Sequence, residues 1–111
     1  MIKISVKAGE EVIDTVTKYL EKKGVTEGSI SIIGAVDECC ISTMPKSDAK
    51  KDILTEYHEP LEMSGTGEIH EGKPHIHAVL GREDKTAVFG HLHWGKVKNW
   101  FVNVYVMPVT D

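Results

Sequence analysis

The sequence predicts an α+β fold in which one helix packs on a mostly antiparallel sheet or on an open barrel. A single segment, residues 10–23, has apolar residues at helical spacing, and it lies early in the chain. The segments after it carry the alternating or short apolar patterns of strands, bounded by Gly, Pro, Asp or Lys. One early helix followed by a run of strands is typical of this class.

The chain opens with a predicted half-buried strand, because Ile2, Ile4 and Val6 alternate with polar residues. The predicted helix, residues 10–23, has acids in its first turn and lysines in its last turn, as the helix dipole favours. Gly24 then stands where a glycine C-cap belongs. The apolar stripe of this helix comprises Val12, Ile13, Val16, Tyr19 and Leu20.

The rest of the chain is predicted to be sheet. We find no internal repeat, low-complexity segment or linker, so one domain is expected to fill residues 1–111. The predicted strands span residues 29–36, 39–44, 53–57, 61–69, 75–80, 87–93 and 100–107.

The composition is that of an ordinary soluble domain. Hydrophobic residues make up 41% of the chain and charged residues 27%, and no apolar run approaches the roughly 20 residues of a membrane span. The first residues lack a basic segment followed by an apolar one, so no secretory signal is expected. A cytoplasmic protein without membrane association is therefore predicted.

The charge pattern does not favour nucleic-acid binding. The net charge is −4, the wrong sign for binding through phosphate neutralisation alone. A modest basic cluster, Lys46, Lys50 and Lys51, is interleaved with Asp48 and Asp52, which is typical of a solvated loop.

The two cysteines are predicted to be structural. Cys39 and Cys40 are adjacent, so on a strand they would face opposite sides. Neither a structural disulfide nor a zinc-binding Cys-X-X-Cys pattern is indicated, and we interpret both as small core or half-buried residues.

Two His-X-His pairs are the most informative feature of the chain. His75 and His77 form the first pair, and His91 and His93 form the second. Side chains two apart on a strand share a face, so each pair offers two imidazoles on one side of a sheet. Imidazole is a common zinc ligand, although surface exposure or packing of these rings is the simpler alternative.

The loop between the two pairs decides whether the rings meet. A three-residue loop, residues 83–85, places His77 opposite His91 and His75 opposite His93, so that all four rings share a face. A four-residue loop, residues 82–85, places the pairs on different sides of the sheet.

The remaining histidines and the tryptophans favour simpler interpretations. His58 and His70 lie in predicted turns, where surface roles are expected. Trp100 is interpreted as a core or subunit-interface residue, and Trp94, next to Gly95, as a packing residue or the wall of a pocket.

A metal site on these histidines could activate a water molecule, and the chain offers carboxylates that could act as its general base. Three neutral imidazoles leave a position for water and lower its pKa, and Glu68 or Glu83 could take its proton. A cupin site is the less favoured comparison, because Leu80 and Gly81 occupy the positions of its glutamate. No Ser-His-Asp pattern, phosphate loop or dinucleotide fingerprint is seen, so no organic cofactor is expected.

Several motifs resemble the plants and prokaryotes conserved (PPC) domain. They are GTGEIHEGKPHIHAVLGRED at residues 65–84, FGHL at 89–92, GKV at 95–97 and IGAV at 33–36. In that family a Gly-Lys-Pro turn precedes a His-X-His strand, an acidic turn, a Gly-Gly-His-Leu segment and a final apolar strand. The layout matches over essentially the whole chain.

The resemblance implies a homotrimer and, in some prokaryotic members, a metal site on histidines that match His75, His77 and His91. Prokaryotic members of this stand-alone type carry a predicted DNA-binding label. Two departures matter: no Arg-Gly-Arg-Pro hook for the minor groove is present, and Phe89 replaces a glycine. His93-Trp94 also stands where aliphatic residues are commoner.

Two functions therefore remain open from the sequence. The favoured one is a non-enzymatic, homotrimeric module that binds DNA or a protein partner and acts in transcriptional regulation. The alternative is a zinc-dependent small-molecule-binding protein or hydrolytic enzyme that uses His75, His77 and His91.

Overall fold

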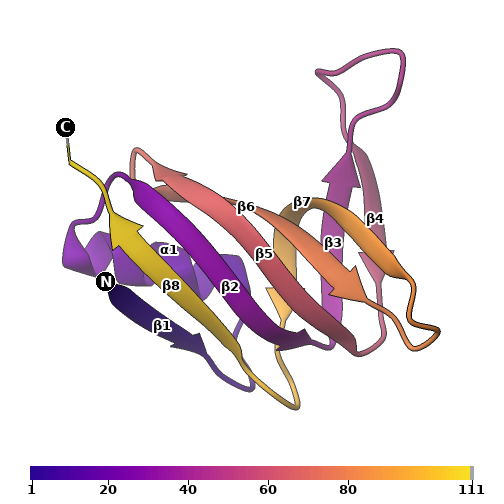
Figure 1. The fold of residues 1–111 in the computed structure, drawn as a ribbon, viewed down its shortest axis with the longest axis horizontal. Helices are drawn as coiled ribbons and strands as arrows, with labels where there is room; N and C mark the ends of the chain where they lie inside the picture. The colour runs from indigo at the N-terminus through magenta and orange to yellow at the C-terminus, as the bar shows by residue number, and fades with distance from the viewer. Residues whose placement is uncertain (111) are drawn as a thin grey trace.

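A computed structural model describes residues 1–110, which form one helix and one eight-stranded sheet (Figure 1). The strand order is β1-β8-β2-β5-β6-β7-β3-β4, and every neighbouring pair is antiparallel. The elements are β1 (Ile2–Val6), α1 (Val12–Lys23), β2 (Gly28–Val36), β3 (Glu38–Thr43), β4 (Ile53–Tyr57), β5 (Leu61–His70), β6 (Lys73–Gly81), β7 (Ala87–Lys96) and β8 (Val102–Pro108).

The sheet is open rather than a closed barrel. Strands β1 and β4 lie at its two ends and do not pair with each other in the described part of the chain. The sheet twists strongly along its width, so the end that carries β7, β3 and β4 is turned away from the β1 end (Figure 1). The predicted class, one helix on a mostly antiparallel sheet, is confirmed in this open form.

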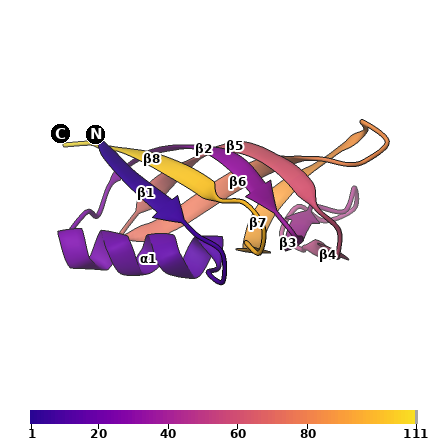
Figure 2. The ribbon, with the colours of Figure 1, turned by 90° about the horizontal axis from the view of Figure 1, so that it is seen from below.

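The core lies between α1 and one face of the sheet (Figure 2). Val12, Val16 and Leu20 recur at helical spacing and are fully buried. On β2, Ile30 and Ile32 are buried on the helix side of the sheet, while Ser31 between them is exposed. This alternation is why the predicted strand pattern located the core correctly.

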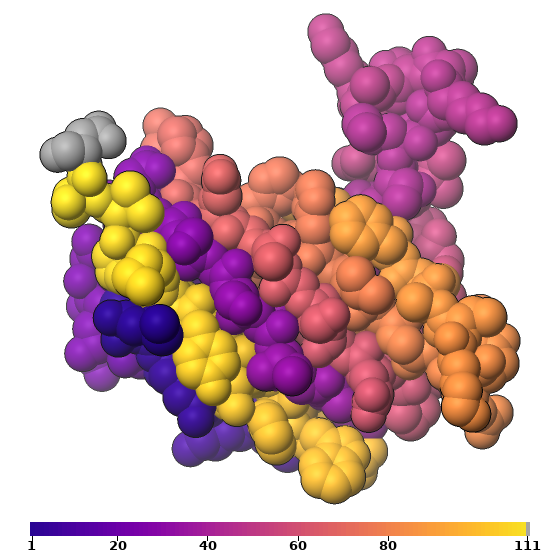
Figure 3. Space-filling model, in the orientation of Figure 1, coloured from indigo at the N-terminus to yellow at the C-terminus, as the bar shows by residue number. Residues whose placement is uncertain are grey.

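The opposite face of the sheet has no helix over it within residues 1–110 (Figure 2). The domain is therefore flat, with principal extents of 39 × 37 × 19 Å. Small and polar residues such as Ser29, Ser31 and Thr66 are exposed on this face, together with His75 and His77. Figure 3 shows this uncovered face of the sheet toward the viewer.

The helix begins two residues later than the sequence predicted, because Glu11 acts as its N-cap. The Glu11 carboxylate accepts hydrogen bonds from the backbone N–H groups of Ile13 and Asp14, and from that of Gly95 on β7. Gly24 adopts the left-handed conformation with φ of 68°, as predicted for the C-cap.

The last strand also differs from the prediction, since it begins at Val102 rather than at Trp100. The Phe101 carbonyl accepts a hydrogen bond from the Ala35 N–H, and the chain turns there into β8. Trp100 precedes this point and is 69% exposed, so its interpretation as a core residue is wrong. No described helix is long and apolar enough to cross a membrane.

Candidate metal centre

A tight hairpin aligns the two His-X-His strands. The Arg82 N–H donates to the Thr86 carbonyl at 2.9 Å, and the Lys85 N–H donates to the Arg82 carbonyl at 2.9 Å. Lys85 takes the left-handed conformation with φ of 69°, as the last position of a three-residue hairpin loop requires. The loop is thus residues 83–85, the first of the two alternatives that the sequence left open, and His77 of β6 pairs with His91 of β7.

Three imidazoles converge on the uncovered face. One ligand nitrogen from each of His75, His77 and His91 lies within 4.8 Å of the others. The ring centroid of His75 lies 5.1 Å from that of His77 and 4.6 Å from that of His91. We call these three residues the histidine triad.

His93 lies beside the triad but does not join it. A three-residue loop was expected to pair His75 with His93 as well, but the β6–β7 ladder ends at His77 and His91. Strand β3 explains the difference: Cys40 pairs with Trp94 and Ile41 with Leu92, which leaves His93 as the extra residue of a bulge. There its Nε2 hydrogen-bonds the Ser42 hydroxyl at 2.8 Å, and its ring stands edge-on to His91.

His91 is the half-buried member of the triad. Its Nδ1 is buried and has no hydrogen-bond partner within the described chain, which is unusual for a buried polar atom. Burial, and then repulsion from the His75, His93 and His77 rings, lowers the pKa of His91 below its ordinary value. Its ring therefore favours the neutral form, which is the form that binds metals.

Two hollows flank the triad. The larger one, of about 460 Å³, is lined by His75, His77 and His91 together with Ser42, Thr43, Met44, Ala49, Asp52, Phe89 and Gly90. The smaller one, of about 360 Å³, is lined by His75, His77, Thr66, Gly67 and Glu68.

The structure separates the two carboxylates proposed as bases. Glu68 pairs with His75 across β5 and β6, so it reaches the smaller hollow. Glu83 lies in the hairpin loop, at the opposite end of β6 from His75, and lines neither hollow. The sequence reasoning missed Asp52, because nothing in its spacing signals that the β3–β4 connection lies beside the triad. It also missed Phe89, although the two-residue spacing from His91 on one strand places both side chains on the same face.

The residues of the triad fit a metal ion. Three imidazoles with an unpartnered buried nitrogen form a nitrogen donor set, which suits zinc and related transition metals. Three protein ligands would leave at least one coordination position for water or another ligand.

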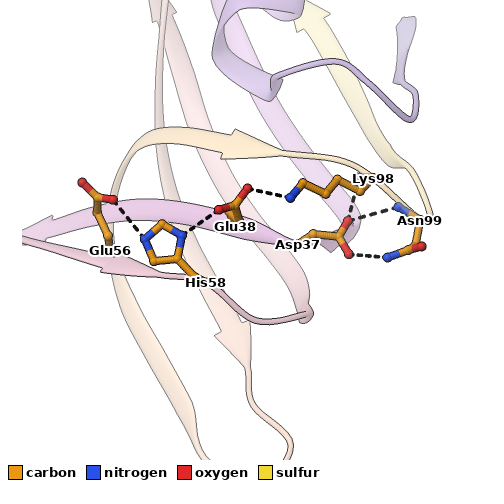
Figure 4. A network of polar contacts seen from close by, with 6 residues as sticks. All are labelled: Asp37, Glu38, Glu56, His58, Lys98 and Asn99. Carbon is orange, nitrogen blue, oxygen red and sulfur yellow. Dashed lines mark hydrogen bonds and ion pairs between the residues drawn. The ribbon is translucent and has the colours of Figure 1, made fainter.

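His58 belongs to a separate polar network (Figure 4). Its ring is exposed, as predicted, with Nδ1 2.7 Å from Glu38 and Nε2 3.1 Å from Glu56. The hydrogen bond to Glu38 raises the pKa of His58, while His58 and then Lys98 lower the pKa of Glu38 to about 2. Nearby, Asp37 accepts hydrogen bonds from the β7–β8 connection, through the Lys98 and Asn99 backbone and the Asn99 amide.

The other histidine, tryptophan and cysteine predictions have mixed outcomes. His70 is exposed, as predicted, and lies 3.4 Å from a Glu27 oxygen. Cys39 and Cys40 are free and buried, as predicted, and burial raises the pKa of Cys39 to about 11. Trp94 is half-buried, with the Lys96 ammonium 5.1 Å from its ring centroid, and it lines neither hollow beside the triad.

The lysine-bearing connection between β3 and β4 projects from the body of the domain (Figures 1 and 3). Within it the Lys50 N–H donates to the Asp48 carboxylate. The interleaved acids keep it from being a continuous basic surface, as the sequence indicated.

Solved structures show the same fold. A metal-containing protein of Archaeoglobus fulgidus is 30% identical over 98% of this chain and 79% of its own, with a TM-score of 0.82. A predicted DNA-binding protein of Ralstonia eutropha is 20% identical over 98% and 78% of the two chains, with a TM-score of 0.85. A plant- and prokaryote-conserved (PPC) protein of Pyrococcus horikoshii is 22% identical over 99% and 79%, with a TM-score of 0.79.

A family model supports the same relationship. Among curated proteins, none matches the sequence at a significant level. The model of the Plants and Prokaryotes Conserved domain, abbreviated PCC or PPC, matches residues 1–110. The chain therefore belongs to the plants and prokaryotes conserved domain family.

Proposed function

We propose that this protein is a metal-binding PPC-domain module of the predicted DNA-binding type, with zinc held by His75, His77 and His91. The observation that carries the metal site is the convergence of three imidazole nitrogens within 4.8 Å. The unpartnered Nδ1 of His91 supports it, because a coordinating ion would satisfy a buried nitrogen that otherwise lacks a partner. The metal-containing relative of Archaeoglobus fulgidus supports it further.

The test of the metal site is elemental analysis of purified, untagged protein after exhaustive dialysis. We expect about one zinc ion per chain in the wild type and loss of this zinc in His77→Ala. His70→Ala is the matched control, because His70 is exposed and lies outside the triad. Equal metal content in His77→Ala and in the wild type would contradict the site, as would a wild type that takes up no metal.

The regulatory part of the proposal is a homotrimer that binds DNA or a protein partner. It is supported by the structurally similar protein of Ralstonia eutropha that is described as a predicted DNA-binding protein. The uncovered sheet face supports assembly, because Ile33 and Met107 are exposed there although both are large and apolar. The net charge of −4 opposes broad electrostatic binding of DNA, so any DNA surface must be local.

Assembly and DNA binding are tested separately. Analytical ultracentrifugation should give three times the chain mass, and a monomer at all concentrations would contradict the trimer. DNA affinity measured between about 50 and 200 mM salt should fall steeply if lysines neutralise phosphates. Absence of DNA binding at the lowest salt would leave a protein partner as the ligand of the module.

A further inference from the structure

Two large apolar side chains are exposed next to the histidine triad. Phe89 is 55% exposed, and its ring stands edge-on to His77 with centroids 5.7 Å apart. Met44 is 65% exposed and belongs to the β3–β4 connection. Both line the larger hollow and neither is part of the buried core, so packing within the chain does not explain them.

A carboxylate faces the same hollow. Asp52 lies at the end of the β3–β4 connection and lines the cavity together with the triad. The cavity thus joins an apolar wall, a carboxylate and the three imidazoles.

The charge around the triad selects the kind of ligand. A divalent ion on three neutral imidazoles would be balanced by two carboxylates, Asp52 in the larger hollow and Glu68 in the smaller one. Among residues 1–110, no lysine or arginine lines either hollow. A simple anion would therefore meet two carboxylates without a cationic partner, whereas a zwitterion would satisfy both signs of charge.

We infer that the larger hollow binds an apolar α-amino acid or a derivative of one. This inference rests on the proposed metal site, because the oxygen donors of the ligand would coordinate the ion. Asp52 would pair with the ammonium group, and Phe89 and Met44 would cover the side chain. The volume of about 460 Å³ lies in the usual range for small-molecule sites.

The experiment compares three probe ligands on zinc-loaded protein by titration calorimetry. Leucine hydroxamate offers metal-binding oxygens, an ammonium group and an isobutyl group. Its desamino analogue lacks the ammonium group, and glycine hydroxamate lacks the isobutyl group. The zinc content of the protein is measured before and after each titration, so that removal of zinc by the probe is not mistaken for binding.

The expected result is that leucine hydroxamate binds best. Asp52→Asn should weaken its binding about tenfold and change the binding of the desamino analogue less than about twofold. Phe89→Ala should weaken both isobutyl-bearing probes about tenfold and leave glycine hydroxamate unchanged. Asp48→Asn is the control, because Asp48 lies in the same connection but does not line the hollow.

The outcomes separate this inference from the proposed metal site. If the wild type holds zinc but the three probes bind equally, or if Asp52→Asn weakens the two isobutyl-bearing probes alike, the inference is overturned and the metal site stands. If zinc does not bind at all, the proposed metal site and the inference fall together.

Discussion

The two histidine-containing sites of this domain place the same side chain in opposite electrostatic surroundings. In the triad, His91 is surrounded by other imidazoles and is half-buried, which lowers its pKa. His58 lies exposed between two carboxylates, which raise its pKa. Neighbouring groups therefore decide whether a histidine side chain is suited to bind a metal ion or to hold a proton.

The largest predicted difference between the two sites is their effect on stability when zinc is added. Zinc in excess should stabilise the wild type by about 2.7 kcal/mol at one hundred times its dissociation constant, because only the folded chain presents the triad. Thermal unfolding with zinc or with a chelator measures this. His58→Gln should respond to zinc as the wild type does, whereas His77→Ala should not respond. An equal zinc response in His77→Ala would contradict zinc binding by the histidine triad.

A second prediction concerns the close strand packing under the triad. A Cβ atom on Gly90 would lie 2.6 Å from the Ser42 carbonyl oxygen, so Gly90→Ala must move β7 away from β3. We expect destabilisation of about 1–3 kcal/mol and weaker zinc binding, measured by denaturant unfolding and metal competition. Gly81→Ala is the matched control on β6, where the nearest atom would be 3.8 Å away. Equal losses of stability and zinc affinity in the two variants would contradict the close packing of β7 against β3 at Gly90.

The order in which the histidines titrate provides a third test. In metal-free protein, NMR of the imidazole protons should show His58 titrating above about 6.5 and His91 below it. Protonation of His91 is opposed by burial and by its neighbours, whereas protonation of His58 gains carboxylate hydrogen bonds. The reverse order would contradict the difference between the two sites.

The smallest predicted effects are in the pH dependence of stability. The pKa of His58 is raised on folding, so its stabilisation is fully present below about 6.5 and is lost as the pH rises through the folded value. The pKa of His91 is lowered, so its contribution is unfavourable as the pH falls below about 6.5 toward the folded value. Unfolding curves of His58→Gln and of the wild type at several pH values should converge at high pH. Curves that stay parallel at all pH values would exclude this role for His58.

Much of the fold was predictable from local sequence patterns. The period-two alternation located the strands, and the Val12-Val16-Leu20 stripe with Gly24 located the helix and its end. The sequence narrowed the hairpin to a loop of three or four residues, and only the structure shows the three-residue loop that pairs His77 with His91. The strand and helix patterns depend on neighbouring residues, which is why the sequence reveals them.

The features that the sequence did not reveal depend on contacts between distant segments. The bulge that moves His93 out of the triad arises from the register between β3 and β7. Asp52 lies at the end of the projecting β3–β4 connection (Figure 1) and lines the larger hollow with residues of β6 and β7, which only the tertiary fold brings beside it. His58 meets Glu38 across the β3–β4 pair, and no local pattern signals that contact.

The most direct test of the central claim is X-ray absorption spectroscopy of the zinc-loaded protein. The account predicts three imidazole ligands at about 2.0–2.1 Å in the wild type, and a loss of imidazole scattering in His77→Ala. A wild-type spectrum with fewer than two imidazoles, or an unchanged spectrum in His77→Ala, would contradict a metal site built on His75, His77 and His91.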